Sequence, residues 1–153
     1  MKIELFSHNL GKEVLERQKP NIYEEVMEAV SNYSPSEYSS PVIKEDLRGI
    51  FKNKNWEWNG KLVKSLPLRF GFRKSRVQVE TQFGNVSRYY TDIIKLQIAK
   101  NEGEISFGIL ILPTQDLADK LGSNVAYFER AKKELPYIED SIELGIFLIG
   151  LKL

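Results

Sequence analysis

The sequence predicts an α/β domain built on a sheet of mixed strand direction. In the middle of the chain, short strand-like segments follow one another with only turns between them, which indicates antiparallel neighbours. Further on, helical patterns separate segments 105–113 and 144–153, which are almost continuously apolar and therefore typical of central strands covered on both faces. The 153 residues suffice for one domain spanning 1–153.

The N-terminal half is mainly helical in pattern. Residues 2–6 fit either a strand or a helical arm. Ile22, Val26 and Val30 recur at helical spacing and predict a helix over 21–33.

A second helix follows a loop rich in serine and proline at 34–41. Ile43, Leu47 and Ile50 form its apolar stripe, and the predicted helix covers 42–54.

Three strand candidates come next. Asn59-Gly60 has the composition of a two-residue hairpin turn, which we expect to join 56–58 to 61–63. Segment 68–72 is a further candidate, and 77–83 alternates apolar and polar residues.

The C-terminal half alternates helices with buried strands. A helix is predicted over 86–100, with Tyr90, Ile93, Ile94 and Ile98 facing inwards. After the apolar strand, one short helix capped by Thr114 and another starting near Ser123 lead to the last strand.

The most informative segment is "VQVETQFGN", which begins at Val77. Its alternation predicts a half-buried strand whose polar face presents Glu80 and Gln82 one pleat apart. Ligands in such sheets gather where strands end, so this pair is either a solvated face or part of a binding site.

Composition excludes several classes of protein. The chain has no cysteine, which excludes disulfides, thiolate zinc sites and a cysteine nucleophile. It has no run of 18 apolar residues and no signal-peptide pattern, so we expect a cytoplasmic protein that does not enter a membrane. The net charge of +1 does not itself indicate a nucleic-acid binder.

The distribution of charge is more informative than the net charge. Between Trp58 and Val79 there are six basic residues and no acidic one. They are Lys61, Lys64, Arg69, Arg73, Lys74 and Arg76. Such a stretch is either a solvated face or a surface that contacts phosphates.

An ordered set of short motifs resembles a known family. The pieces are "IKEDL", "VQVETQFGN", "GILILP", "YFERAKKEL" and "FLIGL". In this order they resemble PD-(D/E)XK nucleases and, more narrowly, type II restriction endonucleases of the BglII kind. The resemblance implies a restriction-endonuclease-like αβββαβ core, here about residues 42–151, flanked by helices.

The resemblance also implies roles for individual residues. The family's carboxylate-x-(Lys, Glu or Gln) motif falls on Glu80-Thr81-Gln82. Glu80 and the Thr81 carbonyl would bind Mg²⁺, and Gln82 would orient the attacking water or bind the ion. Residues after the motif, here Asn85 and Arg88, would contact DNA bases, and the six basic residues would contact its backbone.

One position departs from the family pattern. The family has a metal-binding aspartate about nine residues before the motif glutamate, and this position is Gly71 here. Asp46, at the family's acidic helix position, is the first candidate for a replacement metal ligand and catalytic carboxylate. Glu45 and Glu57 are the reserves.

Two functions remain open from the sequence. One is a homodimeric, Mg²⁺-dependent, sequence-specific endonuclease acting on double-stranded DNA. The other is a catalytically weakened relative that binds DNA, or an interaction module that retains only the fold. The glycine at position 71 favours the second function. The first is favoured by Glu80 and Gln82, by Asn85, and by the basic stretch 61–76.

Overall fold

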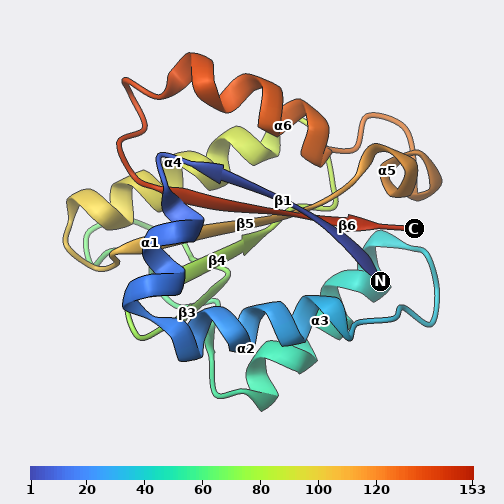
Figure 1. Cartoon of the computed structure of the whole chain (residues 1–153), viewed down its shortest axis with the longest axis horizontal. Coiled ribbons are helices and arrows are strands. Elements are labelled where there is room, and N and C mark those ends of the chain that lie inside the picture. Colours follow the sequence, from blue (N-terminus) through green and yellow to red (C-terminus); the bar gives the residue numbers. More distant parts are fainter.

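The centre of the protein is a six-stranded mixed sheet with helices on both faces (Figure 1). The computed structural model describes all residues 1–153. The strands are β1 (Lys2–His8), β2 (Glu57–Trp58), β3 (Phe72–Lys74), β4 (Val77–Thr81), β5 (Phe107–Pro113) and β6 (Ile146–Lys152). The helices are α1 (Gly11–Gln18), α2 (Pro20–Ser31), α3 (Ser40–Asn53), α4 (Arg88–Asn101), α5 (Gln115–Leu121) and α6 (Phe128–Glu134), followed by a 3-10 turn at Leu135–Ile138.

Strand directions follow from the connections. The order across the sheet is β1-β6-β5-β4-β3-β2. The pairs β2–β3 and β3–β4 are antiparallel, and β4–β5 and β5–β6, which are joined through helices, are parallel. β1 closes the other edge antiparallel to β6. The predicted α/β fold with a mixed sheet is therefore confirmed.

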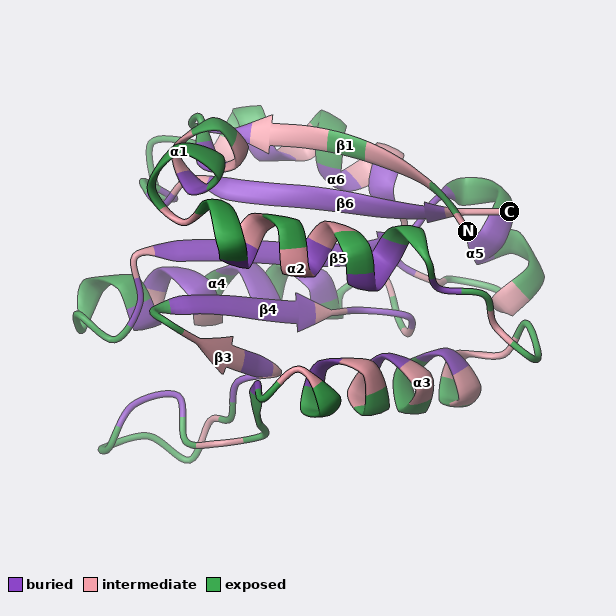
Figure 2. Cartoon of the chain, turned by 60° about the horizontal axis from the view of Figure 1, so that its bottom comes forward, coloured by how far each residue is buried: buried purple, intermediate pink, exposed green.

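Two apolar layers fill the space between sheet and helices. On one face, α1, α2 and α3 pack on strand residues that include Val77 and Val79 of β4. On the other face, α4 and α6 pack on residues that include Leu110 of β5 and Leu148 of β6. Figure 2 shows β4, β5 and β6 buried over nearly their whole length. β4 is consequently an interior strand, and its successive side chains point to two different helical layers.

Most long elements lie where the sequence predicts them. α2, α3, α4, β5 and β6 match predicted segments, and the ambiguous residues 2–6 belong to strand β1. Helix α1 has no counterpart among the predictions, because Val14 and Leu15 are the only aliphatic side chains in its eight residues.

The predicted hairpin at Asn59-Gly60 is wrong. β2 pairs with β3 instead, with Trp58 opposite Phe72. The residues between them, 59–71, form a loop whose two sides meet at an antiparallel bridge between Lys61 and Arg69. A two-residue turn at Ser75-Arg76 joins β3 to β4, with Lys74 opposite Val77. The φ angles of these two turn residues are positive, 50° and 65°. Two successive positive φ angles give the turn twist that hairpins require, even without glycine or asparagine.

The predicted inward face of α4 is also partly wrong. Ile93 is buried as expected, but Ile94 is 52% exposed and Tyr90 is exposed as well. The buried side of the helix includes Asp92, which is a polar residue, so the hydrophobic pattern alone misplaces the face. No helix in the protein is both long and apolar enough to cross a membrane.

Gly49 provides a test of the packing of α3. It lies at an exposed position inside the helix, and a Cβ atom built there would have no neighbour within 4 Å. We expect Gly49→Ala to raise the free energy of unfolding by about 1 kcal/mol, because alanine restricts the unfolded chain and favours helix. Urea denaturation measures the change.

Gly11→Ala is the contrasting variant. A Cβ atom at Gly11 would lie 2.5 Å from backbone atoms of Gly145 and Ile146, so this substitution must lower stability. A Gly49→Ala protein less stable than wild type would show that α3 does not pack as described.

Candidate active site

A buried carboxylate, that of Glu80, lies at the centre of the site. Glu80 is 3% exposed. The backbone N–H of Gly71 donates to both of its oxygens at 3.1 Å, and the Gln78 amide donates to Oε1 at 2.9 Å. Lys95 Nζ contacts Oε2 at 3.0 Å. The carboxylate is therefore fixed by donors from β4, from the residue before β3, and from α4.

Asp92 is the second carboxylate of this site. Its Oδ2 accepts a hydrogen bond from Gln82 Nε2 at 2.8 Å, and its Oδ1 lies 3.4 Å from Lys95 Nζ. Gln82 is itself oriented, because its Oε1 accepts the Gly84 N–H at 3.0 Å. One ammonium group thus contacts both carboxylates, and no buried side-chain nitrogen or oxygen in the protein lacks a hydrogen-bond partner.

The local sequence explains this arrangement. Alternation along β4 points Val79 to the α3 side and Glu80 to the α4 side. Asp92 and Lys95 are three residues apart on α4, so both side chains lie on the same side of the helix, towards the sheet.

The polar face predicted for this strand is not half exposed. Gln78, Glu80 and Gln82 are all less than 9% exposed, because α4 covers them. Their hydrogen-bond partners are one another, α4, Arg73 and the backbone N–H groups of Gly71 and Gly84. The predicted alternation is present, but an interior strand with helices on both faces has no solvated side.

Burial dominates the electrostatics of the two acids. It raises the pKa of the Glu80 carboxyl to about 7, although the Lys95 ammonium opposes the shift. Burial also raises the pKa of Asp92, again opposed by Lys95. A cation between the two groups stabilises their ionised forms, so the site is suited to positive charge.

Gly71 is directly beside the motif glutamate. Its N–H binds the Glu80 carboxylate from nine residues earlier in the chain. A Cβ atom at this position would come within 2.6 Å of the Val79 carbonyl oxygen and 3.0 Å of Glu80 Oε2. The position where the family resemblance implies an aspartate is therefore next to Glu80, but β4 leaves no room for a side chain unless the backbone shifts.

The three predicted replacements lie elsewhere. Asp46 accepts a hydrogen bond from Tyr33 at 2.9 Å, on the helix that packs on the opposite face of the sheet from Glu80. Glu45 and Glu57 are exposed. None of them contacts Glu80, and the protein has no group of three or more aspartate, glutamate or histidine side chains that could hold a metal.

Two of the six basic residues of the 61–76 stretch are used inside the protein. Arg73 donates to Gln78 Oε1 at 2.7 Å and to the Leu62 carbonyl at 3.1 Å. Lys74 forms an ion pair with Glu25 at 2.9 Å. These contacts hold β3 against its neighbours, so their charges are not available at the surface in the way the sequence predicts.

The other four basic residues are exposed. Lys61, Lys64 and Arg69 line one hollow in the 59–71 loop. Arg76, in the β3–β4 turn, donates to the Gly103 carbonyl at 2.8 Å.

Asn85 and Arg88 are exposed immediately after the end of β4. The Asn85 side chain accepts the backbone N–H of Ser87 at 2.9 Å, which fixes the turn that leads into α4.

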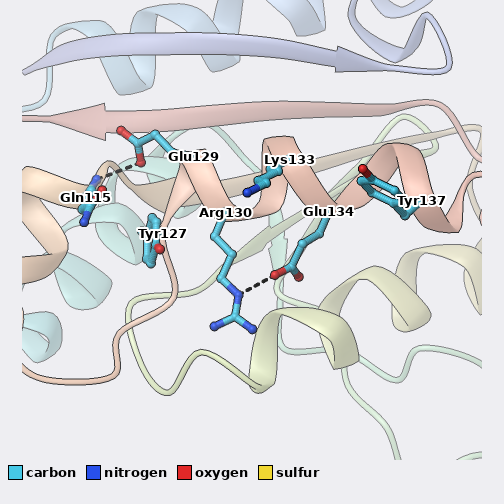
Figure 3. Close-up of a pocket in the computed structure, with 7 residues that line it drawn as sticks. All are labelled: Gln115, Tyr127, Glu129, Arg130, Lys133, Glu134 and Tyr137. Atoms are coloured by element: carbon cyan, nitrogen blue, oxygen red, sulfur yellow. Dashed lines mark hydrogen bonds and ion pairs between the residues drawn. The ribbon is translucent and has the colours of Figure 1, made fainter.

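A separate pocket of about 530 Å³ lies beside α6 (Figure 3). Within it, Arg130 pairs with Glu134 at 2.6 Å, and the Gln115 N–H donates to Glu129 at 2.9 Å. Tyr137 at its edge is 87% exposed. None of the residues predicted to act on DNA or metal lines this pocket, and two of its four charged residues pair with each other.

Asp92 and Lys95 are the site residues that the sequence reasoning missed. The side of α4 that faces the sheet could have revealed them. Tyr89, Ile93 and Leu96 are fully or almost fully buried, and Asp92 and Lys95 lie next to this buried stripe. An acid and a base at that position must pair or find partners in the sheet.

The mixed sheet, together with a buried carboxylate and amide at the end of a central strand, defines a restriction-endonuclease-like α/β protein. The family described as "Restriction endonuclease BglII/BglIII" matches residues 3–151, and the chain belongs to this family.

Solved structures agree on the fold. The crystal structure of restriction endonuclease BglII complexed with a DNA 16-mer gives a TM-score of 0.84 at 18% identity, covering 100% of this chain and 77% of that one. Free BglII gives 0.75 at 19% identity, covering 99% and 79%. No curated protein matches the chain.

The raised pKa of Glu80 predicts a pH dependence of stability. Between pH 4.5, the ordinary value, and about 7, the folded protein keeps a proton that the unfolded chain releases. The contribution of Glu80 to the free energy of unfolding is therefore complete below pH 4.5, and it is lost as the pH rises to about 7. Glu80→Gln removes the titration, so its free energy of unfolding relative to wild type should rise over this window.

Urea denaturation in metal-free buffer at several pH values measures that difference. Because Asp92 also raises the pKa of Glu80, the difference reports the titration of the coupled pair of acids. A difference that stays constant from pH 4.5 to about 7 would contradict the burial of an ionisable Glu80.

Proposed function

We propose that this protein is a Mg²⁺-dependent, type II site-specific endonuclease that cleaves double-stranded DNA. The observation that carries the proposal is a pair of buried carboxylates near the end of β4. Glu80 and Asp92 both contact the ammonium of Lys95 there. Membership of the BglII/BglIII restriction endonuclease family and the likeness to BglII complexed with DNA support DNA as the substrate.

The residues present fit a magnesium ion. Mg²⁺ is commonly held by one or two carboxylates together with water and substrate phosphate oxygens. Glu80 and Asp92 would supply the carboxylates, and the Thr81 carbonyl would supply a further oxygen. When bound, the ion would polarise the phosphate and lower the pKa of a water molecule. In this proposal Asp92 takes the role that the sequence predicts for Asp46, because the Lys95 ammonium contacts both Asp92 and Glu80.

Gln82 acts as a positioning residue in this proposal. Its amide nitrogen holds Asp92 and its oxygen accepts the Gly84 N–H, so both polar ends have partners within the protein. An amide has no useful basicity, so Gln82 does not accept a proton. Its contribution is to fix the orientation of the second carboxylate.

The proposed DNA contacts come from residues after β4 and from exposed basic residues that precede it in the chain. Asn85 and Arg88, exposed just after β4, would read base edges. Lys61, Lys64, Arg69 and Arg76 would contact phosphates, whereas Arg73 and Lys74 serve within the protein. A homodimer would match the two-fold symmetry of a short palindrome.

A second candidate function is DNA binding without efficient cleavage. The observation in its favour is Gly71, which provides no carboxylate beside Glu80 and no room for one. Glu80 and Asp92 compensate the charge of a divalent ion less than they would with a further carboxylate at position 71.

Plasmid cleavage distinguishes the two functions. Glu80→Gln and Asp92→Asn should lower the rate of Mg²⁺-dependent cleavage of supercoiled DNA by about 100-fold or more, because each removes a proposed metal ligand. DNA binding without metal should remain. Asp46→Asn is the matched control and should cleave like wild type, since Asp46 contacts Tyr33 instead.

The reverse pattern, with cleavage abolished in Asp46→Asn and kept in Asp92→Asn, would refute the assignment of Asp92. A wild-type protein that binds DNA but never cuts it with Mg²⁺ or Mn²⁺ would establish the second function.

The exposed loop predicts the salt dependence of DNA binding. Replacing Lys61, Lys64 and Arg69 together by alanine should reduce the slope of log K against log salt by about 0.9 for each phosphate that the variant no longer neutralises. Fluorescence anisotropy on a DNA duplex at several salt concentrations measures the slope. The triple variant Lys2, Arg17 and Lys19 to alanine removes the same charge from β1 and from residues 17–19, and should leave the slope nearly unchanged.

An equal reduction of the slope in both triple variants would mean that the effect reflects net charge and not binding of phosphates by the 59–71 loop.

A further inference from the structure

We infer that Lys95 is a tethered cation that occupies the place of the metal between Glu80 and Asp92, so that a divalent ion binds only when this ammonium is displaced. This inference rests on the proposed function and adds to it a determinant of metal affinity on α4.

The geometry supports mutual exclusion. Lys95 Nζ is 3.0 Å from Glu80 Oε2 and 3.4 Å from Asp92 Oδ1, so it contacts both acids. A divalent ion held by the same two carboxylates would need the space that the ammonium uses. Two cations so close together repel each other strongly in a site shielded from water.

No other cation of the protein takes this place. Glu80 and Asp92 form ion pairs with Lys95 alone. The remaining donors to the two carboxylates are neutral, namely the Gly71 N–H and the amides of Gln78 and Gln82. Without Lys95, neither buried acid would have a cation in direct contact, which is costly, because Lys44 and Arg73 act on Asp92 and Glu80 only from a longer range.

The ammonium is also able to leave. The side chain of Lys95 is 14% exposed, compared with 4% for Glu80 and 10% for Asp92, so it reaches the edge of the buried site. Lysine carries its charge on a flexible four-carbon stem with little directional constraint. Its displacement therefore requires a change of side-chain conformation and no movement of α4.

Calorimetric titration of the DNA-free protein with Mn²⁺ tests the inference. Lys95→Met should bind Mn²⁺ at least about tenfold more tightly than wild type, because the competing charge is gone and interactions between close charges reach this size. Lys100→Met is the matched control: it removes the same charge from an exposed position on α4 and should leave the affinity unchanged.

Thermal unfolding gives a second measure. Metal-free Lys95→Met should melt below wild type, and Mn²⁺ should raise its melting temperature by more than it raises that of wild type, because tighter binding stabilises the folded state more. If Lys95→Met does not fold without metal, Lys95→Gln, which keeps a hydrogen-bond donor without the charge, should show the same tightening.

The outcomes separate this inference from the proposed function. Unchanged or weaker Mn²⁺ binding by the Lys95 variants, together with binding that Glu80→Gln abolishes, overturns the role of Lys95 and leaves the metal site in place. An absence of Mn²⁺ binding in wild type and in the Lys95 variants overturns both.

Discussion

The position of β4 inside the sheet determines which residues can act together. Because β3 pairs with one edge of β4 and β5 with the other, its side chains alternate between two closed helical layers. Val77 and Val79 complete the apolar layer under α3, and the intervening residues face α4. The charged group of Glu80 therefore lies against α4, which supplies its one cation, and Asp46 on α3 is separated from it by the sheet.

The burial of two acids imposes a second constraint. Charges removed from water destabilise a protein unless they are paired and hydrogen-bonded. Here every buried side-chain polar atom has a partner, and neutral amides surround the acids together with one ammonium. The amides of Gln78, on β4, and Gln82, just after it, thus fill this layer as apolar residues fill the layer on the other face, while keeping the site polar.

The sequence predicted the framework better than the site. Long segments with clear periodicity, such as β5 and α2, were found because burial of one face or both leaves a strong pattern. Glu80 was identified because the ordered motifs of the chain resemble those of a known family. Asp92 and Lys95 were missed because their significance depends on which side of α4 faces the sheet, and that follows from packing. The prediction of a hairpin at Asn59-Gly60 is wrong because the composition of a turn does not identify which strand pairs with the one before it.

Gly71 has a consequence for how the site could change during evolution or engineering. An aspartate at this position would collide with the Val79 carbonyl, so it becomes compatible only if the path of β4 changes as well. The two changes are coupled, so their combined effect on stability differs from the sum of their separate effects. Libraries that vary position 71 together with residues 77–81 can therefore reach site geometries that no single substitution can.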